Sequence, residues 1–315
     1  MNYSVNRRKT VKVVATAAFA GGTFNIWAQS KPETLVKSFY DSLSTTQKKV
    51  MLFDWEHLKK GYVDNNWNIV DEDDYSIGKF YSSQQQKLIH SIFKSSLSEQ
   101  GFKRYSKQIQ DDSDGFANFT CGLFGAPGKE FEFVLTGRHL TLRADGNLTD
   151  KAAFGGPIFY GHATRFTEKA DHKGNVWWHQ AVLANAVYSS LDRGQKKKAL
   201  LEKAPADNRK VINLKGKSGK FAGLAIKNMN ESQKKLVQRT IDSLFISFKK
   251  PDVDEALKFI KEYGGMDALY ISFYEQRDLG DDKIWDRWMI EGPGFVWYFR
   301  GSPHVHSWVN IGVPS

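Results

Sequence analysis

Two histidines one residue apart lie near the C-terminus of this 315-residue chain, in the phrase His304-Val-His306. The preceding run from Phe295 to Arg300 is aromatic and β-branched, which favours a strand, and the segment from Gly301 to Pro303 is typical of a turn. In a strand, side chains at positions i and i+2 point to the same face of the sheet. The side chains of His304 and His306 would therefore project from the same face. This arrangement suits chelation of one metal ion. The alternative is a pair of exposed histidines on a surface strand.

Two further histidines stand in short motifs far from this pair, His139 after Arg138 and His162 after a glycine-rich run. Three to four imidazoles make an adequate shell for zinc, copper or iron. We therefore predict a transition-metal site with His139, His304 and His306 as ligands and His162 as a fourth ligand or acid–base group. Only the fold can bring these residues together, and the alternative is a set of structural histidines bonded to the backbone.

Arg138 lies beside one of the predicted ligands. A guanidinium near a metal can bind the carboxylate, sulfate or phosphate of a small anionic substrate in bidentate fashion. The alternative is an ordinary surface ion pair. We predict that Arg138 fixes such a substrate.

Composition excludes several other kinds of site. The formal net charge is +10, but the lysines are scattered and do not interleave with aromatic residues, so nucleic-acid binding is not expected. A single cysteine, Cys121, rules out a zinc site built from several cysteines. The acidic run from Asp111 to Asp114 lacks the distal glutamate of a calcium loop and indicates a solvated turn. No nucleophile elbow and no local Ser-His-Asp signature is present.

Residues 1–28 have the pattern of a cleavable export signal. A basic segment, Asn6 to Lys12, precedes a weakly apolar run from Val13 to Ile26, and a cleavage point follows at Ala28. The adjacent Arg7 and Arg8 resemble a twin-arginine (Tat) signal, with the general secretory route as the alternative. We expect a periplasmic or secreted bacterial protein without stable membrane insertion, because no later stretch reaches about 18 uninterrupted apolar residues.

Four short phrases recur at nearly equal offsets in the remaining chain, residues 29–315. Ser42 to Lys49 matches Ser190 to Lys197, and Ser82 to Ile89 matches Asn230 to Val237. Each phrase offers a capping residue followed by apolar residues at helical spacing. The same comparison pairs strand-like segments with a glycine midway. The predicted helices are 33–60, 82–101, 179–204 and 230–248, and the predicted strands are 116–123, 131–143, 268–275 and 288–300.

These elements predict one α+β domain made of two half-repeats, about 33–146 and 179–310, each with the order helix-helix-strand-strand. We expect an antiparallel sheet flanked by helices on one face, with the halves related by a pseudo-twofold axis. The alternative is a chance likeness between amphipathic helices. The segment 145–173 between the halves shows few regular signals and is predicted to be a long aromatic loop.

An ordered set of motifs resembles a known family. The phrases are Leu135 to Leu142, Phe154 to His162, and Glu291 to Phe295 followed by His304-Val-His306. Together with the helix starts, they are similar to the family catalogued as domain of unknown function 3500, over about residues 33–310. Arg138 stands where the family pattern has a histidine, whereas His139 matches. The resemblance implies a secreted bacterial protein and implies no activity.

Two functions therefore follow from the sequence. The first is an exported metalloenzyme, a hydrolase or an oxidoreductase, that acts on a small anionic substrate. The second is a non-catalytic periplasmic binding protein for a glycan or another small molecule, in which the histidines are structural. The reaction, the metal and the oligomeric state stay open.

Overall fold

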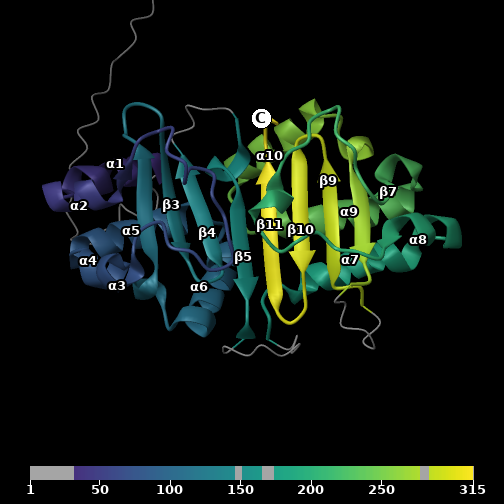
Figure 1. Ribbon diagram of the computed structural model, residues 1–315, viewed down its shortest axis with the longest axis horizontal. Helices are drawn as coiled ribbons and strands as arrows, with labels where there is room; N and C mark the ends of the chain where they lie inside the picture. Colours follow the sequence, from purple (N-terminus) through teal and green to yellow (C-terminus); the bar gives the residue numbers. More distant parts are fainter. Residues whose placement is uncertain (1–31, 146–150, 165–173, 277–283, 315) are drawn as a thin grey trace, which may run out of the picture.

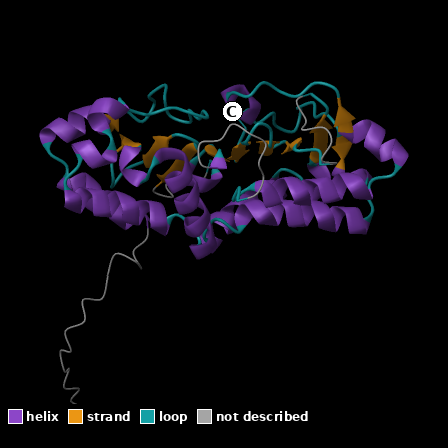
Figure 2. Ribbon diagram, turned by 90° about the horizontal axis from the view of Figure 1, so that it is seen from below, coloured by secondary structure: helices purple, strands orange, loops and turns teal. Residues whose placement is uncertain are grey.

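A computed structural model describes residues 32–145, 151–164, 174–276 and 284–314 (Figure 1). Within this part of the chain, eleven strands form one sheet, and the long helices lie against one of its faces (Figure 2). The α+β class and the mainly antiparallel sheet flanked by helices are thus confirmed. The predicted signal peptide, residues 1–28, lies outside the described residues. No helix of the described part is long and apolar enough to cross a membrane.

The order of strands across the sheet is symmetric about one central antiparallel pair, β5 (Ile158–His162) and β11 (Val305–Ile311), which lie side by side in Figure 1. The full order is β1-β2-β3-β4-β5-β11-β10-β9-β8-β6, with β7 paired to β8. Neighbours are antiparallel except β1–β2 and β6–β8, which are parallel. The other strands are β1 (Leu52–Phe53), β2 (Thr120–Gly125), β3 (Phe131–Gly137), β4 (Leu140–Asp145), β6 (Leu200–Leu201), β7 (Leu224–Ala225), β8 (Tyr270–Tyr274), β9 (Arg287–Gly292) and β10 (Phe295–Arg300).

The helices are shorter and more numerous than predicted, because polar caps divide the long helical patterns. Ser98, for example, caps a new helix inside the segment predicted as 82–101. The segments 33–60 and 179–204 are each divided in the same way, and the helix that follows residue 249 was not predicted. The helices are α1 (Pro32–Ser42), α2 (Thr45–Met51), α3 (Glu72–Tyr75), α4 (Ile77–Phe80), α5 (Ser83–Ser95), α6 (Glu99–Ser113), α7 (Trp178–Ser190), α8 (Arg193–Ala199), α9 (Glu231–Phe245) and α10 (Lys250–Glu262).

The recurring phrases of the sequence meet in pairs. Helices α2 and α5 both begin with capping boxes, whose glutamines Gln47 and Gln85 also donate to each other's side-chain oxygens at 2.9 Å. Helices α8 and α9 repeat this arrangement with Gln195 and Gln233, at 3.1 and 2.8 Å. The same helix-start geometry therefore occurs in both halves of the chain.

Both long predicted strands turn out to be hairpins. The glycine expected to kink the segment 131–143 instead ends β3, and the chain returns as β4. The segment 288–300 folds back in the same way as β9 and β10. The predicted loop 145–173 is also wrong in part, because it contains the central strand β5. This strand is short and interrupted by Gly161, so its pattern is too weak to recognise from the sequence.

The two faces of the sheet are covered differently. In β10, Phe295, Trp297 and Phe299 pack among the helices, whereas Val296 and Tyr298 face the opposite side. That second face is covered by loops, which Figure 2 shows on the side away from the long helices. The candidate site lies at the end of the central β5–β11 pair where β5 finishes and β11 begins.

Candidate metal centre

The three histidines predicted as ligands meet in space. The Nε2 atoms of His304 and His306 are 2.9 Å apart, and they lie 3.2 and 3.0 Å from Nε2 of His139. All three residues are buried, with exposed fractions of 1%, 8% and 3% for His139, His304 and His306. Among the described residues, no other group of three histidine, cysteine or acidic side chains has its ligand atoms this close together.

The triangle of nitrogens has the size that one metal ion requires. With metal–nitrogen bonds of about 2.1 Å, edges of this length give N–metal–N angles of about 90–100°. Such angles would place the three imidazoles on one side of the ion, so these histidines alone would not fill its remaining coordination positions. An open position is what distinguishes a catalytic metal site from a closed structural one.

His139 occupies a tight turn rather than a strand. It links β3 to β4 with a left-handed φ of 55°, a conformation that costs a non-glycine residue free energy and often marks a functional site. Its N–H donates to the Asn65 carbonyl at 2.9 Å. Its carbonyl accepts from Gln108 Nε2 at 2.7 Å and from the Gly161 N–H at 3.0 Å. Three surrounding segments therefore hold the strained turn in place.

A buried carboxylate fixes the ring of His139. Oδ2 of Asp112, near the end of α6, lies 2.8 Å from Nδ1 of His139, while Oδ1 accepts from the Ala163 N–H at 3.0 Å. A carboxylate accepts hydrogen bonds, so Nδ1 carries the proton and Nε2 presents a lone pair to the other two histidines. The expectation of a solvated acidic turn is thus wrong for Asp112, which is fully buried.

The other two ligands come from the start of the last strand. His306 is on β11, and His304 immediately precedes it, after a turn with a cis Ser302–Pro303 peptide bond. Opposite His306 on β5 stands Gly161. A Cβ atom at position 161 would lie 2.5 Å from the Val305 carbonyl oxygen, 3.2 Å from the His306 ring and 3.3 Å from the His139 ring. Glycine at this position therefore allows the imidazoles to approach each other.

The surroundings keep the imidazoles of His304 and His306 neutral. Burial, followed by the charges of His139, Arg300 and Arg138, lowers the pKa of His304 to about 3. Burial and the Arg300 charge likewise hold the pKa of His306 well below its ordinary value. Metal ligation requires deprotonated nitrogens, so these ligands do not have to lose a proton at neutral pH.

The remaining two predicted site residues are placed differently. Arg138 is partly exposed beside the three histidines, and its charge acts on both His304 and His306. His162 is buried on β5, but Nδ1 accepts from the Val176 N–H at 3.1 Å and Nε2 bonds to Asp111 at 3.0 Å. Ligation by His162 would require one of these bonds to break, so its role as fourth ligand or acid–base group stays a prediction.

The residues that support the ligands were missed in the sequence. Gln108 and Asp112 are four residues apart on α6 and hold the carbonyl and the ring of His139 from the same helix face. The predicted helix ended at residue 101. Extension of its amphipathic pattern through Ser113 would have placed both residues on a helix and removed Asp112 from the turn.

Comparisons with known proteins bear on the family alone. A search of curated proteins and a search of solved structures found no match for this chain. A family model described as protein of unknown function (DUF3500) matches residues 29–309, a span that contains all four predicted histidines. Since this match covers nearly the whole chain, as the motif resemblance led us to expect, the protein belongs to the DUF3500 family.

Proposed function

We propose that this protein is an exported metalloenzyme in which His139, His304 and His306 bind one transition-metal ion. The observation that carries the proposal is the convergence of three buried Nε2 atoms within 3.2 Å of one another. N–H···N hydrogen bonds cannot satisfy all three of these contacts at once, because each neutral ring has at most one N–H to donate, whereas a cation would accept a lone pair from every Nε2 atom. Asp112 supports this reading, because a carboxylate behind a metal-binding histidine sets the tautomer and raises its basicity.

The coordination positions that the three histidines leave unfilled would suit chemistry on a small anionic molecule. Zinc would supply a water of lowered pKa for hydrolysis, and copper or iron would supply redox chemistry. Arg138 would hold the negative charge of the substrate beside the metal. His162 and Asp111, which bond to each other, would act as the neighbouring proton-carrying pair.

Metal analysis of the full-length protein, purified without a histidine tag, tests the proposal. We expect about one equivalent of a transition metal per chain, and His306→Gln should retain less than about a tenth of it. His57→Gln is the matched control, since His57 packs against Phe53 and Phe124 away from the centre. A wild-type protein that contains no metal, and takes up none from a zinc, copper or iron buffer, would refute the metal site.

A binding protein for a glycan or another small molecule is the second candidate, and one cavity favours it. This cavity has a volume of about 440 Å³ and is lined by Trp55, His57 and the carboxylates of Glu56 and Glu130, among other residues. Aromatic rings and carboxylates are groups that hold sugars. A metal-free protein that binds a sugar would favour this function over the enzyme.

The cellular setting is also part of the proposal. We infer that residues 1–28 direct export, by the twin-arginine or the general secretory route, and that residues 29–315 fold as one periplasmic or secreted domain. We infer further that its halves descend from one repeated unit. The paired capping glutamines and the symmetric strand order support that origin.

A further inference from the structure

Two buried arginines continue the row of side chains that begins at the histidine centre. Arg300 on β10 is the cross-strand partner of His306 on β11 and of Arg287 on β9. Directly opposed residues of antiparallel strands share a face of the sheet. The exposed fractions of Arg300 and Arg287 are 9% and 2%. Two guanidiniums are therefore enclosed on the loop-covered face, with the nearer one next to a predicted metal ligand.

One carboxylate serves both arginines. Oδ2 of Asp207 lies 3.2 Å from Arg300 Nη1 and 3.3 Å from Arg287 Nη2, while Oδ1 accepts from the Tyr298 hydroxyl at 2.9 Å. The Nε–H groups of both arginines are buried and have no hydrogen-bond partner among the described residues. Burial of a guanidinium costs free energy when one of its donors is unpaired and its carboxylate partner is shared with a second guanidinium. A bound anion would offset this cost.

Arg300 is tied to the histidine centre as well as to Asp207. Its Nη2 donates to the His304 carbonyl at 3.2 Å. Its position opposite His306 on the neighbouring strand brings the Arg300 charge to the centre from β10. Arg138, which precedes His139 in the β3–β4 turn, supplies a second positive charge beside the centre. The histidine centre is thus flanked by positive charge from two separate segments.

We propose that Arg300, together with Arg287, binds an oxyanion group of the substrate, a carboxylate or a phosphate, next to the metal. This assignment rests on the proposed metal centre. The planar guanidinium has the geometry to bind two oxygens of such a group, and Asp207 holds it in place. The substrate class is therefore a small molecule whose reacting atom is adjacent to its carboxylate or phosphate.

Titration with simple anions tests this proposal independently of catalysis. The full-length protein, with its metal content measured, is titrated by calorimetry with inorganic phosphate and, separately, with acetate. Arg300→Met should weaken binding of the preferred anion at least about tenfold, as expected for loss of a bidentate charged contact, and leave the metal content unchanged. Arg300→Lys keeps the positive charge but loses the paired N–H donors of the guanidinium. Its affinity for the anion should lie between those of wild type and Arg300→Met.

Matched variants separate the possible failures. Arg193→Met removes an exposed arginine on α8 and should leave anion binding unchanged. If Arg300→Met does not fold, Arg300→Lys alone decides, since lysine keeps the positive charge and the aliphatic stem. Equal anion affinity in wild type and in the folded Arg300 variants, or no binding of either anion by wild type, would overturn the proposal. A wild-type protein without metal would instead refute the metal centre, while the Arg300 comparison would still report on the anion site.

Discussion

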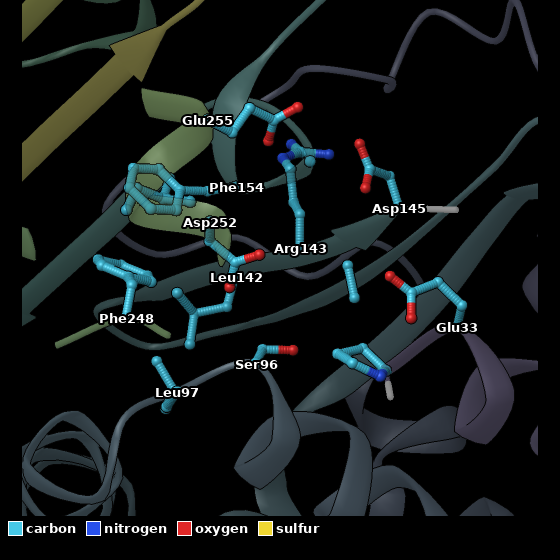
Figure 3. A pocket seen from close by; sticks show the side chains of 14 residues that line it. Glu33, Ser96, Leu97, Leu142, Arg143, Asp145, Phe154, Phe248, Asp252 and Glu255 are labelled. Carbon is cyan, nitrogen blue, oxygen red and sulfur yellow. The ribbon is translucent and has the colours of Figure 1, made fainter. Parts of the chain in front are cut away.

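The two ends of strand β4 carry opposite kinds of chemistry. At its start, His139 joins the histidine centre. At its far end, Arg143 and Asp145 line a pocket with three further carboxylates, those of Glu33 on α1 and Asp252 and Glu255 on α10 (Figure 3). Each region gathers residues from both halves of the chain. Only the histidine centre brings its ligand atoms to one point.

The difference between these two regions shows that the charge of the side chains limits how closely their ligand atoms can approach one another. Neutral imidazoles carry no net charge, so their nitrogens can approach within 3.2 Å at little electrostatic cost. Carboxylates at that distance would repel strongly, and one of them would hold its proton instead. Burial, followed by the charges of Asp145 and Glu33, accordingly raises the pKa of Asp252 to about 7. A cluster of potential ligands is therefore a metal site only where its atoms converge and its charges permit it.

The largest expected effect concerns the carboxylate end. Arg143 forms a buried ion pair with Glu132 and donates to the carbonyls of Pro157 at 2.7 Å and Tyr62 at 2.6 Å. Arg143→Met should lower the free energy of unfolding by about 3–5 kcal/mol, because it leaves a buried carboxylate unpaired. Urea unfolding measures this. The double variant Arg143→Met with Glu132→Gln should recover part of the loss, and an unchanged single variant would show that the pair contributes nothing.

At the histidine end, the next effect is on metal affinity. Asp112→Asn should weaken metal binding about 10–100-fold, since a neutral amide no longer holds the Nδ1–H tautomer of His139. Competition with a chelator measures the dissociation constant. Asp111→Asn is the neighbouring control: Asp111 bonds to His162, so a change below about threefold is expected there. Equal losses in both variants would argue against a special role of Asp112.

The pH dependence of stability should distinguish the carboxylate end. The pKa of Asp252 rises from 3.8 to about 7 on folding, so the folded state binds this proton more tightly than the unfolded state. The contribution of the protonated Asp252 carboxyl to the free energy of unfolding is complete below pH 3.8 and is lost as pH rises through 7. Asp252→Asn should therefore be more stable than wild type by about 1–2 kcal/mol at pH 8, with solvent screening taken into account.

Unfolding curves from pH 4 to pH 8 provide the measurement, and the gain should vanish near pH 4. The control is Asp254→Asn on the same helix, where an exposed aspartate pairs with Lys250. If the free energy of unfolding increases by the same amount at every pH, the substitution acts through packing. The pKa of the Asp252 carboxyl would then not be raised by folding.

The smallest effect tests the strained turn at the histidine end. His139→Gly and His139→Ala both remove the ligand, but glycine tolerates a φ of 55° and alanine does not. In metal-free protein, the glycine variant should be more stable by about 1 kcal/mol. At Lys87, an exposed position inside helix α5, the same pair of substitutions should reverse its order by about 1 kcal/mol, because glycine destabilises the interior of a helix. The same order at both positions would contradict strain at His139.

Local sequence patterns predicted much of the architecture and most of the residues of the site. The spacing of His304 and His306 predicted a shared face, and the capping phrases located helix starts at α5 and α9. The β3–β4 hairpin was mistaken for a single strand because its turn, Arg138 and His139, has no glycine or proline of its own. The β9–β10 hairpin was missed although Pro293 and Gly294 form its turn, because the glycine was interpreted as a kink within one strand. Asp112, Arg287 and Arg300 were missed because their roles depend on partners far away in the chain.

The sequence by itself determined the family, the α+β class and the residue types of the centre, since these depend on local composition, spacing and motif order. Only the tertiary structure decided that His139 reaches the C-terminal pair. This contact depends on β5 lying beside β11 and on α6 bringing Asp112 under the β3–β4 turn. Those are contacts between segments distant along the chain. They are set by packing of the whole sheet, which no short stretch of residues encodes.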